Sequence, residues 1–271
     1  MQALAVLEDG GVLVLPHLPF AELDTARWLL DPKWADPRRK NISFDSTSQS
    51  LRGVHADAAV CEAVRTLMGG FQNLALVLIA ALAPRYAAQM RTAPVSLRLH
   101  EVQGRQSSWR ADDSRLHIDA FPSRPSHGER ILRVFRNINP DGKVRTWRVG
   151  EPFIDVARRF GGQVPRYRRA HAIVLNMLGM TRSVRSPYDH TMLHLHDRMK
   201  ADLDYQRTCP QSSVPFAPHT TWVCFSDQTS HAAMSGQFLL EQTLHPTVAV
   251  MQNPAKAPIA VLDSMFHRSM R

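Results

Sequence analysis

The sequence predicts an α+β protein whose short strands build a double-stranded β-helix, or jelly-roll, core with helices outside it. Strand-like segments bounded by turn residues recur through the second half of the chain, whereas Ala- and Leu-rich helical segments dominate residues 20–90. No internal repeat or low-complexity tract interrupts the 271 residues, and a hydrophobic content of 44% suffices for one substantial core. We therefore expect a single jelly-roll domain spanning 1–271, with an N-terminal helical layer at about 20–90.

The first third of the chain is expected to be mainly helical. A strand at 11–16, a helix at about 20–30, a polar loop at 32–53 and two helices at about 54–68 and 71–90 are expected in that order. The apolar run at 74–83 has ten residues and ends at Pro84, well short of the roughly 20 needed to span a bilayer. We expect this run to lie in a buried helix.

Strands dominate the remainder of the expected fold. The segment 130–139 alternates in the manner of a strand, and Ser186 and Pro187 provide a cap and a first helical residue for a helix at 187–206. Further strands are expected at 95–103, 115–119, 220–225 and 236–244, and a further helix near 152–160.

Two histidines and one carboxylate are the main candidates for a metal site. The pleat of a strand sends residues i and i+2 to the same face, so His117 and Asp119 can point at one ion while Ile118 points away. A neighbouring strand can deliver His231, which follows a predicted strand and a polar turn. Iron(II) held by two imidazoles and one carboxylate keeps positions open for dioxygen and a bidentate 2-oxo acid. This pattern predicts an iron-dependent oxygenase.

The H-x-D spacing alone does not establish that site, because similar pairs occur elsewhere. His55 and Asp57 lie in an Ala-rich predicted helix, where residues i and i+2 diverge by roughly 200° around the axis. His127 and Glu129 lie in a Pro/Ser/Gly turn that fixes side-chain direction poorly. Local context therefore favours the pair that begins at His117.

The distal histidine has two candidates. His171 lies 54 residues after His117 and is followed eleven residues later by Arg182, a spacing common in oxygenases whose basic residue pairs with the co-substrate carboxylate. His231 has no Lys or Arg at that spacing, but strand patterns flank it on both sides, whereas none surround His171. On these residues alone, both candidates stand.

Four longer blocks give a more specific indication. They are KNISFD at 40–45, LHIDAFPSRPSHGERILRVFRNINP at 116–140, RSPYDHTMLHLHDRMKADLDYQ at 185–206 and SDQTSHAAMSGQFLLEQT at 226–243. From about residue 40 onward the chain resembles the Kdo hydroxylases, iron(II)- and 2-oxoglutarate-dependent enzymes of lipopolysaccharide. The resemblance implies His117, Asp119 and His231 as metal ligands, and 2-oxoglutarate and dioxygen as co-substrates. It also implies hydroxylation at C3 of Kdo (3-deoxy-D-manno-oct-2-ulosonic acid) on lipid A.

The distal carboxylate of 2-oxoglutarate needs a cation, and the strand at 130–139 is the expected source. Alternation puts Arg133 on one face together with Asn137, an amide that can hydrogen-bond a polar ligand, and puts Arg136 on the other face. The planar fork of a guanidinium binds a carboxylate through two parallel hydrogen bonds. Arg133 is the expected ligand, and Arg136 and Arg130 are the alternatives.

The basic charge of the chain is concentrated in one segment. Residues 105–200 contain 19 Lys and Arg against 9 Asp and Glu, whereas the rest contains 14 against 15. Such a face attracts polyanions. Kdo-lipid A is the expected partner, with Arg182, Arg185 and Lys200 as substrate-binding residues. Nucleic acid matches the charge equally, but no nucleic-acid-binding signature or aromatic stacking platform is present, so no nucleic-acid partner is expected.

Two alternative functions remain open at this point. An oxygenase acting on another small molecule or lipid would keep the metal site, and a non-enzymatic basic module would bind polyanions without it. The N-terminal segment lacks a basic n-region and carries Glu8 and Asp9, unlike a secretory signal. We expect a cytoplasmic protein with a peripheral contact at the cytoplasmic face of the inner membrane.

Overall fold

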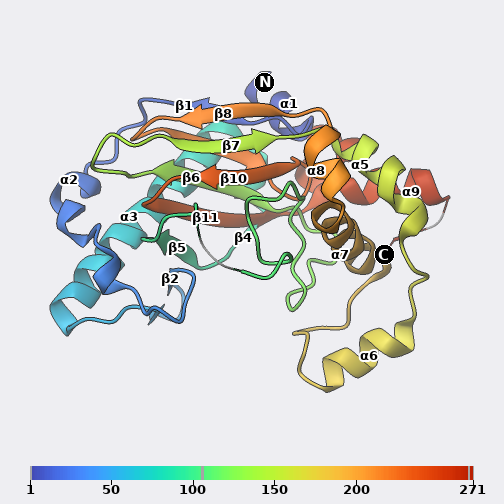
Figure 1. Cartoon of the computed structure of the whole chain (residues 1–271), viewed down its shortest axis with the longest axis horizontal. Helices are drawn as coiled ribbons and strands as arrows, with labels where there is room; N and C mark the ends of the chain where they lie inside the picture. The colour runs from blue at the N-terminus through green and yellow to red at the C-terminus, as the bar shows by residue number, and fades with distance from the viewer. Residues whose placement is uncertain (1, 105–106, 268, 271) are drawn as a thin grey trace.

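Two antiparallel sheets face each other in the core of the computed structural model, which describes residues 2–104, 107–267 and 269–270 (Figure 1). The larger sheet has the strand order β1-β9-β6-β11-β5-β2-β3, with β4 also paired to β11, and the smaller has the order β10-β7-β8. The expected α+β jelly-roll class is confirmed. The strands of the larger sheet are β1 (Leu13–Leu15), β2 (Ile42–Asp45), β3 (Ser50–Arg52), β4 (Met90–Thr92), β5 (Val95–Arg98), β6 (Leu132–Asn137), β9 (Thr221–Phe225) and β11 (Leu239–Pro246). Those of the smaller sheet are β7 (Arg145–Val149), β8 (Ser212–Phe216) and β10 (His231–Ser235).

Strand alternation gives the larger sheet an apolar side chain on each face. In β6, Val134 joins the main core, whereas Phe135 packs between the two sheets. There Phe216 and Trp222 stack with ring centroids 4.0 Å apart, and Trp147 of β7 meets Trp222 edge-on at 5.4 Å. These aromatic contacts hold the smaller sheet over the larger one.

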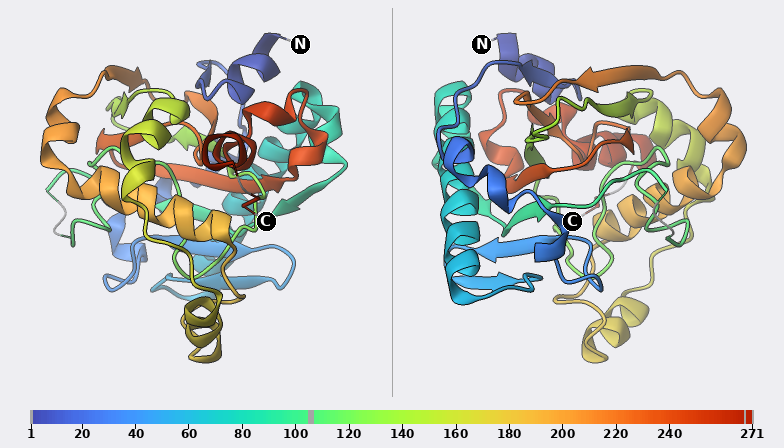
Figure 2. Two further views of the ribbon diagram at one scale, coloured as in Figure 1. Left: turned by 90° about the vertical axis from the view of Figure 1, so that its right-hand side faces the viewer. Right: turned by 60° about the vertical axis from the view of Figure 1, so that its left-hand side comes forward.

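Helices cover the outside of the sheets. The N-terminal layer comprises α1 (Gln2–Glu8), α2 (Glu22–Ala26), α3 (Ala58–Leu82) and α4 (Pro84–Ala87). The remaining helices are α5 (Phe153–Phe160), α6 (Arg169–Met177), α7 (Pro187–Ala201), α8 (Leu203–Thr208) and α9 (Pro258–Phe266). Figure 2 shows α3 lying along the larger sheet, and α6 projecting from the body on an arm of chain.

Helix α3 is longer than the sequence pattern indicated. It runs without a break through Gly69 and Gly70, which lie between the two helices expected at about 54–68 and 71–90. Gly70 serves packing instead, because a Cβ there would lie 2.9 Å from Cγ of Glu22 in α2. By length and composition α3 is the one helix among the described residues that could cross a membrane, but 44% of its most apolar window is buried. A core helix with one face on a sheet passes the same test.

Several other elements differ from expectation. The segment 32–53 contains β2 and β3 rather than only loop, and 115–119 contributes a single bridge residue instead of a strand. The helix expected at 187–206 divides at Asp202, whose side chain accepts a hydrogen bond from the N–H of Tyr205 and so begins α8. Polar turns and edge strands carry weak periodic signals, so tertiary pairing decided these elements.

Candidate metal centre and adjoining cavities

The candidate metal ligands come together because an antiparallel bridge joins their segments. The N–H of His117 donates to the carbonyl of His231 at 3.0 Å, and the N–H of His231 donates back at 2.9 Å. The N–H of Asp119 donates to the carbonyl of Ser226 at 2.7 Å, which fixes the next turn of the chain. The alternation holds without a full strand: Ile118 is buried in the apolar core, whereas His117 and Asp119 line a cavity of about 240 Å³.

The three side chains can supply ligand atoms to one ion. One ligand atom from each of His117, Asp119 and His231 lies within 4.8 Å of the others, and all three side chains are buried. Nδ1 of His117 donates to the carbonyl of Arg115 at 2.7 Å, and Nδ1 of His231 donates to the carbonyl of Thr229 at 2.8 Å. These contacts select the tautomer that leaves each Nε2 unprotonated for a metal. The donor set suits iron(II).

The surroundings keep these ligands in the protonation states that metal binding requires. Burial, followed by the proximity of His231, lowers the pKa of His117 well below its ordinary value, and burial also lowers the pKa of His231. Burial opposes ionisation of Asp119, yet Arg133 and the two histidines hold the pKa of its carboxyl below the ordinary value. At neutral pH the site therefore presents two neutral imidazoles and one carboxylate.

Three arginines from different strands border the same cavity, of which Arg145 is buried and Arg98 and Arg133 are partly buried. Arg98 ends β5, Arg133 lies in β6 and Arg145 begins β7. Glu241 of β11 lies between the first two, 2.6 Å from Nη2 of Arg98 and 3.3 Å from Nη1 of Arg133. Nε of Arg133 is also 3.2 Å from Oδ2 of Asp119. Arg145 donates to a backbone carbonyl at 3.0 Å and forms no ion pair with any residue that the structure describes.

Several donors beside the metal ligands have no acceptor. Nε of Arg98, Nε of Arg145 and Nε1 of Trp147 are buried without a hydrogen-bond partner in the described part of the chain. Trp147 also stacks on His231, with ring centroids 4.9 Å apart. Burial lowers the pKa of Arg145 to about 10, so this guanidinium remains charged at neutral pH. Unpaired buried donors are costly, so their presence here indicates a site for an acceptor-rich anion.

Sequence reasoning missed Arg98, Arg145 and Trp147. They lie on two strands, β5 and β7, whose positions opposite the metal ligands depend on long-range pairing. One usable signal was present: in the segment RTWRV, residues 145 and 147 alternate to the same face.

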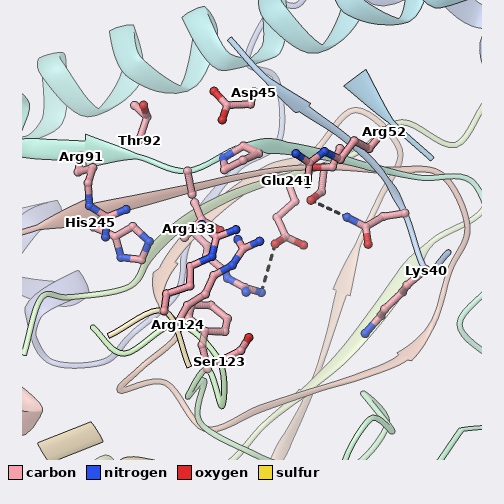
Figure 3. Close-up of a pocket in the computed structure, with 18 of the residues that line it drawn as sticks. Lys40, Asp45, Arg52, Arg91, Thr92, Ser123, Arg124, Arg133, Glu241 and His245 are labelled. Atoms are coloured by element: carbon pink, nitrogen blue, oxygen red, sulfur yellow. Dashed lines mark hydrogen bonds and ion pairs between the residues drawn. The ribbon is translucent and has the colours of Figure 1, made fainter. Parts of the chain in front are cut away.

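A larger cavity of about 740 Å³ adjoins the metal cavity. Both are lined by Lys40, Arg98, Phe121 and Arg133. Figure 3 shows Arg52, Arg91, Arg124 and Arg133 around this second hollow. Burial, then repulsion by Arg182 and Arg52, lowers the pKa of Arg124, which reflects the proximity of these three guanidinium groups. The larger cavity is therefore suited to an anionic ligand.

The other residues predicted to bind the co-substrate lie outside both cavities. Nε of Arg130 donates to Oδ2 of Asp227 at 2.8 Å, and both side chains are fully buried. Arg136 points from the opposite face of β6 and donates to a backbone carbonyl and to Oγ1 of Thr221. Nδ2 of Asn137 donates to two backbone carbonyls. The structure does not support Arg130, Arg136 or Asn137 as co-substrate ligands, because each is committed to contacts that hold the fold together.

The three residues predicted to bind substrate lie in different places, two in the cavities and one outside them. Arg182 lines the larger cavity, and Lys200 lines the metal cavity, where its Nζ donates to the carbonyl of Arg110 at 2.8 Å. Arg185 lines neither cavity and instead donates to the carbonyl of Pro122. His171, the alternative distal ligand, is exposed on α6 and is not part of the metal cluster.

Comparison with known proteins places the chain in one family. The family model described as 3-deoxy-D-manno-oct-2-ulosonic acid (Kdo) hydroxylase matches residues 1–269. One similar solved structure is that of the Kdo hydroxylase KdoO, a non-heme iron(II) and α-ketoglutarate-dependent dioxygenase, in complex with α-ketoglutarate and iron(III). Its sequence is 40% identical to this chain, and the match has a TM-score of 0.94 and covers 99% of this chain and 90% of that one. The KdoO complex with cobalt(II) is 41% identical, with a TM-score of 0.95 over the same shares of the two chains. No match was found among curated proteins. On the family model and these structures, the chain belongs to the Kdo hydroxylase family.

Proposed function

We propose that this chain is an iron(II)- and 2-oxoglutarate-dependent dioxygenase that hydroxylates C3 of Kdo on Kdo-lipid A. The observation that carries the proposal is the buried cluster of His117, Asp119 and His231 beside unpaired arginine and tryptophan donors. Family membership supports Kdo as the sugar. The attachment of Kdo to lipid A and the C3 position are the specific parts of the proposal.

His117, Asp119 and His231 would hold the iron, which when bound supplies the activation of dioxygen and the oxidation of an unactivated C–H bond. The protein contributes placement. The Nδ1 contacts of the two histidines fix their rings, and Arg133 keeps the carboxylate of Asp119 ionised. No side chain is required as a general base for removal of hydrogen from carbon.

Two ends of 2-oxoglutarate need different partners in this cavity. Arg133 already faces Asp119 and Glu241, so its guanidinium lies at the metal end. No carboxylate among the described residues pairs with Arg145, and its Nε and Nε1 of Trp147 are hydrogen-bond donors without an acceptor there. We therefore assign the distal carboxylate to Arg145 and Trp147, with Arg98 and Arg133 completing the positive wall. This assignment revises the expectation that Arg133 alone takes that carboxylate.

The larger cavity is the proposed substrate site. It opens beside Arg133 and carries the group of Arg52, Arg124 and Arg182, which form no ion pairs within the described chain. Kdo is an acidic sugar, and guanidinium groups recognise carboxylates and phosphates through bidentate hydrogen bonds. A glycolipid substrate would bring the protein to the cytoplasmic face of the inner membrane, where we propose that it acts.

Succinate release tests the proposal directly. The iron-loaded protein is incubated in air with 2-oxoglutarate, with and without Kdo-lipid A, beside a His117→Ala control, and the lipid is analysed by mass spectrometry for one added oxygen. We expect iron-dependent release that the lipid stimulates, together with oxidised Kdo. Succinate release at the same rate with and without the lipid would exclude Kdo-lipid A as the substrate. No release under any condition, with polyanion binding that survives chelation, would favour a non-enzymatic binding module.

A further inference from the structure

The arm formed by residues 164–185, with α6 at its end, exposes an unusual amount of apolar surface. Its exposed large apolar side chains are Ile173, Val174, Met177, Leu178 and Met180, with exposed fractions of 38, 50, 80, 69 and 59%. They make up five of the eleven exposed large hydrophobic residues among the described residues. Figures 1 and 2 show that α6 stands away from both sheets and from the other helices.

The apolar residues of α6 form a stripe that faces solvent. Ala170, Ile173, Val174 and Met177 are spaced i, i+3, i+4 and i+7, which puts them on one side of the helix, and all four are exposed. Ala172 is the one residue of α6 that is buried. A surface helix ordinarily turns such a stripe toward the core. Here the stripe points outward, so it is available to an external apolar phase.

The charge around this stripe has a single sign. Within the arm, residues 164–185, the chain has five arginines and no acidic residue. Arg166 and Arg168 precede α6, Arg169 is its first residue, and all three are exposed. Apolar side chains flanked by arginines match an interfacial helix, whose apolar face enters the headgroup region while its cations contact anionic lipids.

The base of the arm is tied to the wall of the larger cavity. The N–H of Arg182 donates to the carbonyl of Ser123, and both residues line that cavity. The hydroxyl of Tyr167 donates to the carbonyl of Arg185 at 2.8 Å, which joins the two limbs of the arm. The arm is therefore attached to the body beside the cavity proposed to bind the sugar.

We propose that the arm is a membrane-docking element whose apolar stripe inserts into an anionic lipid surface. The inference rests on the proposed function in one respect, because a membrane-resident substrate gives the docking its purpose. A lipid surface fits better than a protein groove, since the apolar residues continue past the helix to Leu178 and Met180 and arginines precede and follow them.

Vesicle binding tests the proposal without catalysis. The full chain, without iron or 2-oxoglutarate, is sedimented with vesicles of phosphatidylcholine containing phosphatidylglycerol, and with phosphatidylcholine vesicles. A Met177→Gln/Leu178→Gln variant is compared with Val77→Gln/Leu203→Gln, whose targets on α3 and α8 are exposed by 59 and 55%. Loss of two inserted apolar side chains should weaken partitioning into the anionic vesicles by at least about tenfold, and the control should bind as the wild type does.

A second variant isolates the charge. Arg168→Gln/Arg169→Gln should weaken binding to anionic vesicles and leave any binding to phosphatidylcholine unchanged, and added salt should mimic it. Circular dichroism verifies that each variant is folded.

Equal vesicle binding by the wild type and the Met177→Gln/Leu178→Gln variant would overturn the proposal, as would absence of wild-type binding. A change of oligomeric state in this variant, without a change in vesicle binding, would also overturn it by assigning the stripe to a second copy of the chain. Because binding is measured without turnover, failure of Kdo hydroxylation would be seen separately in the succinate assay.

Discussion

Arg145 offers a quantitative test of how the metal cavity binds a dicarboxylate. Arg145→Gln retains a polar side chain but removes the buried charge that has no ion-pair partner among the described residues. A hydrogen bond to a charged group contributes about 1.5–3 kcal/mol, and about 1.4 kcal/mol corresponds to a factor of ten. The KM for 2-oxoglutarate should therefore rise about 10- to 150-fold. The kcat at saturating 2-oxoglutarate should change less, because the substitution leaves His117, Asp119 and His231, which would hold the metal, unaltered.

Arg130→Gln is the matched control, because it makes the same substitution at another buried arginine that was a candidate for the same role. Arg130 is paired with Asp227, so its removal leaves a buried carboxylate without its partner, at a cost of about 3–5 kcal/mol. This loss should lower the Tm by roughly 10 °C. Arg145→Gln removes an unpaired buried cation and should leave the Tm within a few degrees of the wild type.

The two variants should separate binding from stability. Initial rates of succinate formation across a range of 2-oxoglutarate concentrations give the KM, and thermal melts without ligand give the Tm. We expect a raised KM with a preserved Tm for Arg145→Gln, and the reverse for Arg130→Gln. An unchanged KM in Arg145→Gln would refute the assignment of the distal carboxylate and return it to Arg133.

The metal, the turn beside Arg145 and the co-substrate give three further predictions. His231→Ala should abolish stoichiometric iron binding measured by metal analysis, whereas His171→Ala should bind iron as the wild type does; the opposite result would exchange their roles. Gly236→Ala should raise the KM for 2-oxoglutarate, because residue 236 has φ +118° and the added Cβ would lie 2.7 Å from Cγ of Arg145 and push that side chain aside. An unaltered KM would show that Arg145 binds the co-substrate equally well after being displaced. In thermal melts with cobalt(II), 2-oxoglutarate at about 100 times its Kd should stabilise the wild type by about 2.7 kcal/mol, which raises the Tm by roughly 5–10 °C. The Tm of Arg145→Gln should rise only at higher 2-oxoglutarate concentrations.

The metal ligands could be predicted because their signal is local. His117 and Asp119 needed only the period of an extended chain, and the structure keeps that period although the segment forms a single bridge rather than a strand. The distal histidine was different, since spacing favoured His171, strand context favoured His231, and the family resemblance decided between them. The bridge between His117 and His231 explains that outcome physically.

The arginines were harder to predict because their roles depend on what each one faces. Arg130, Arg133 and Arg136 lie within seven residues of one another, yet one pairs with Asp227, one borders the metal cavity and one points to the opposite face of β6. Alternation separates Arg133 from Arg136 but says nothing about Arg98 or Arg145, which reach the cavity from other strands. Long-range strand pairing supplies that information, and a single sequence does not contain it in readable form.

The charge balance of the metal cavity explains why metal and co-substrate should bind cooperatively. Among the described residues, six cationic side chains line the cavity, namely Lys40, Arg98, Arg110, Arg133, Arg145 and Lys200, and three carboxylates, those of Asp113, Asp119 and Glu241, lie in or beside it. The cavity gains two positive charges when it holds iron(II), and 2-oxoglutarate brings two negative charges. Each ligand therefore reduces the electrostatic cost of binding the other, a coupling that is reciprocal by thermodynamic necessity. Because Glu241 occupies Arg98 and Arg133, the unused capacity of the arginine wall lies with Arg145, which favours an anion long enough to reach from the metal to β7.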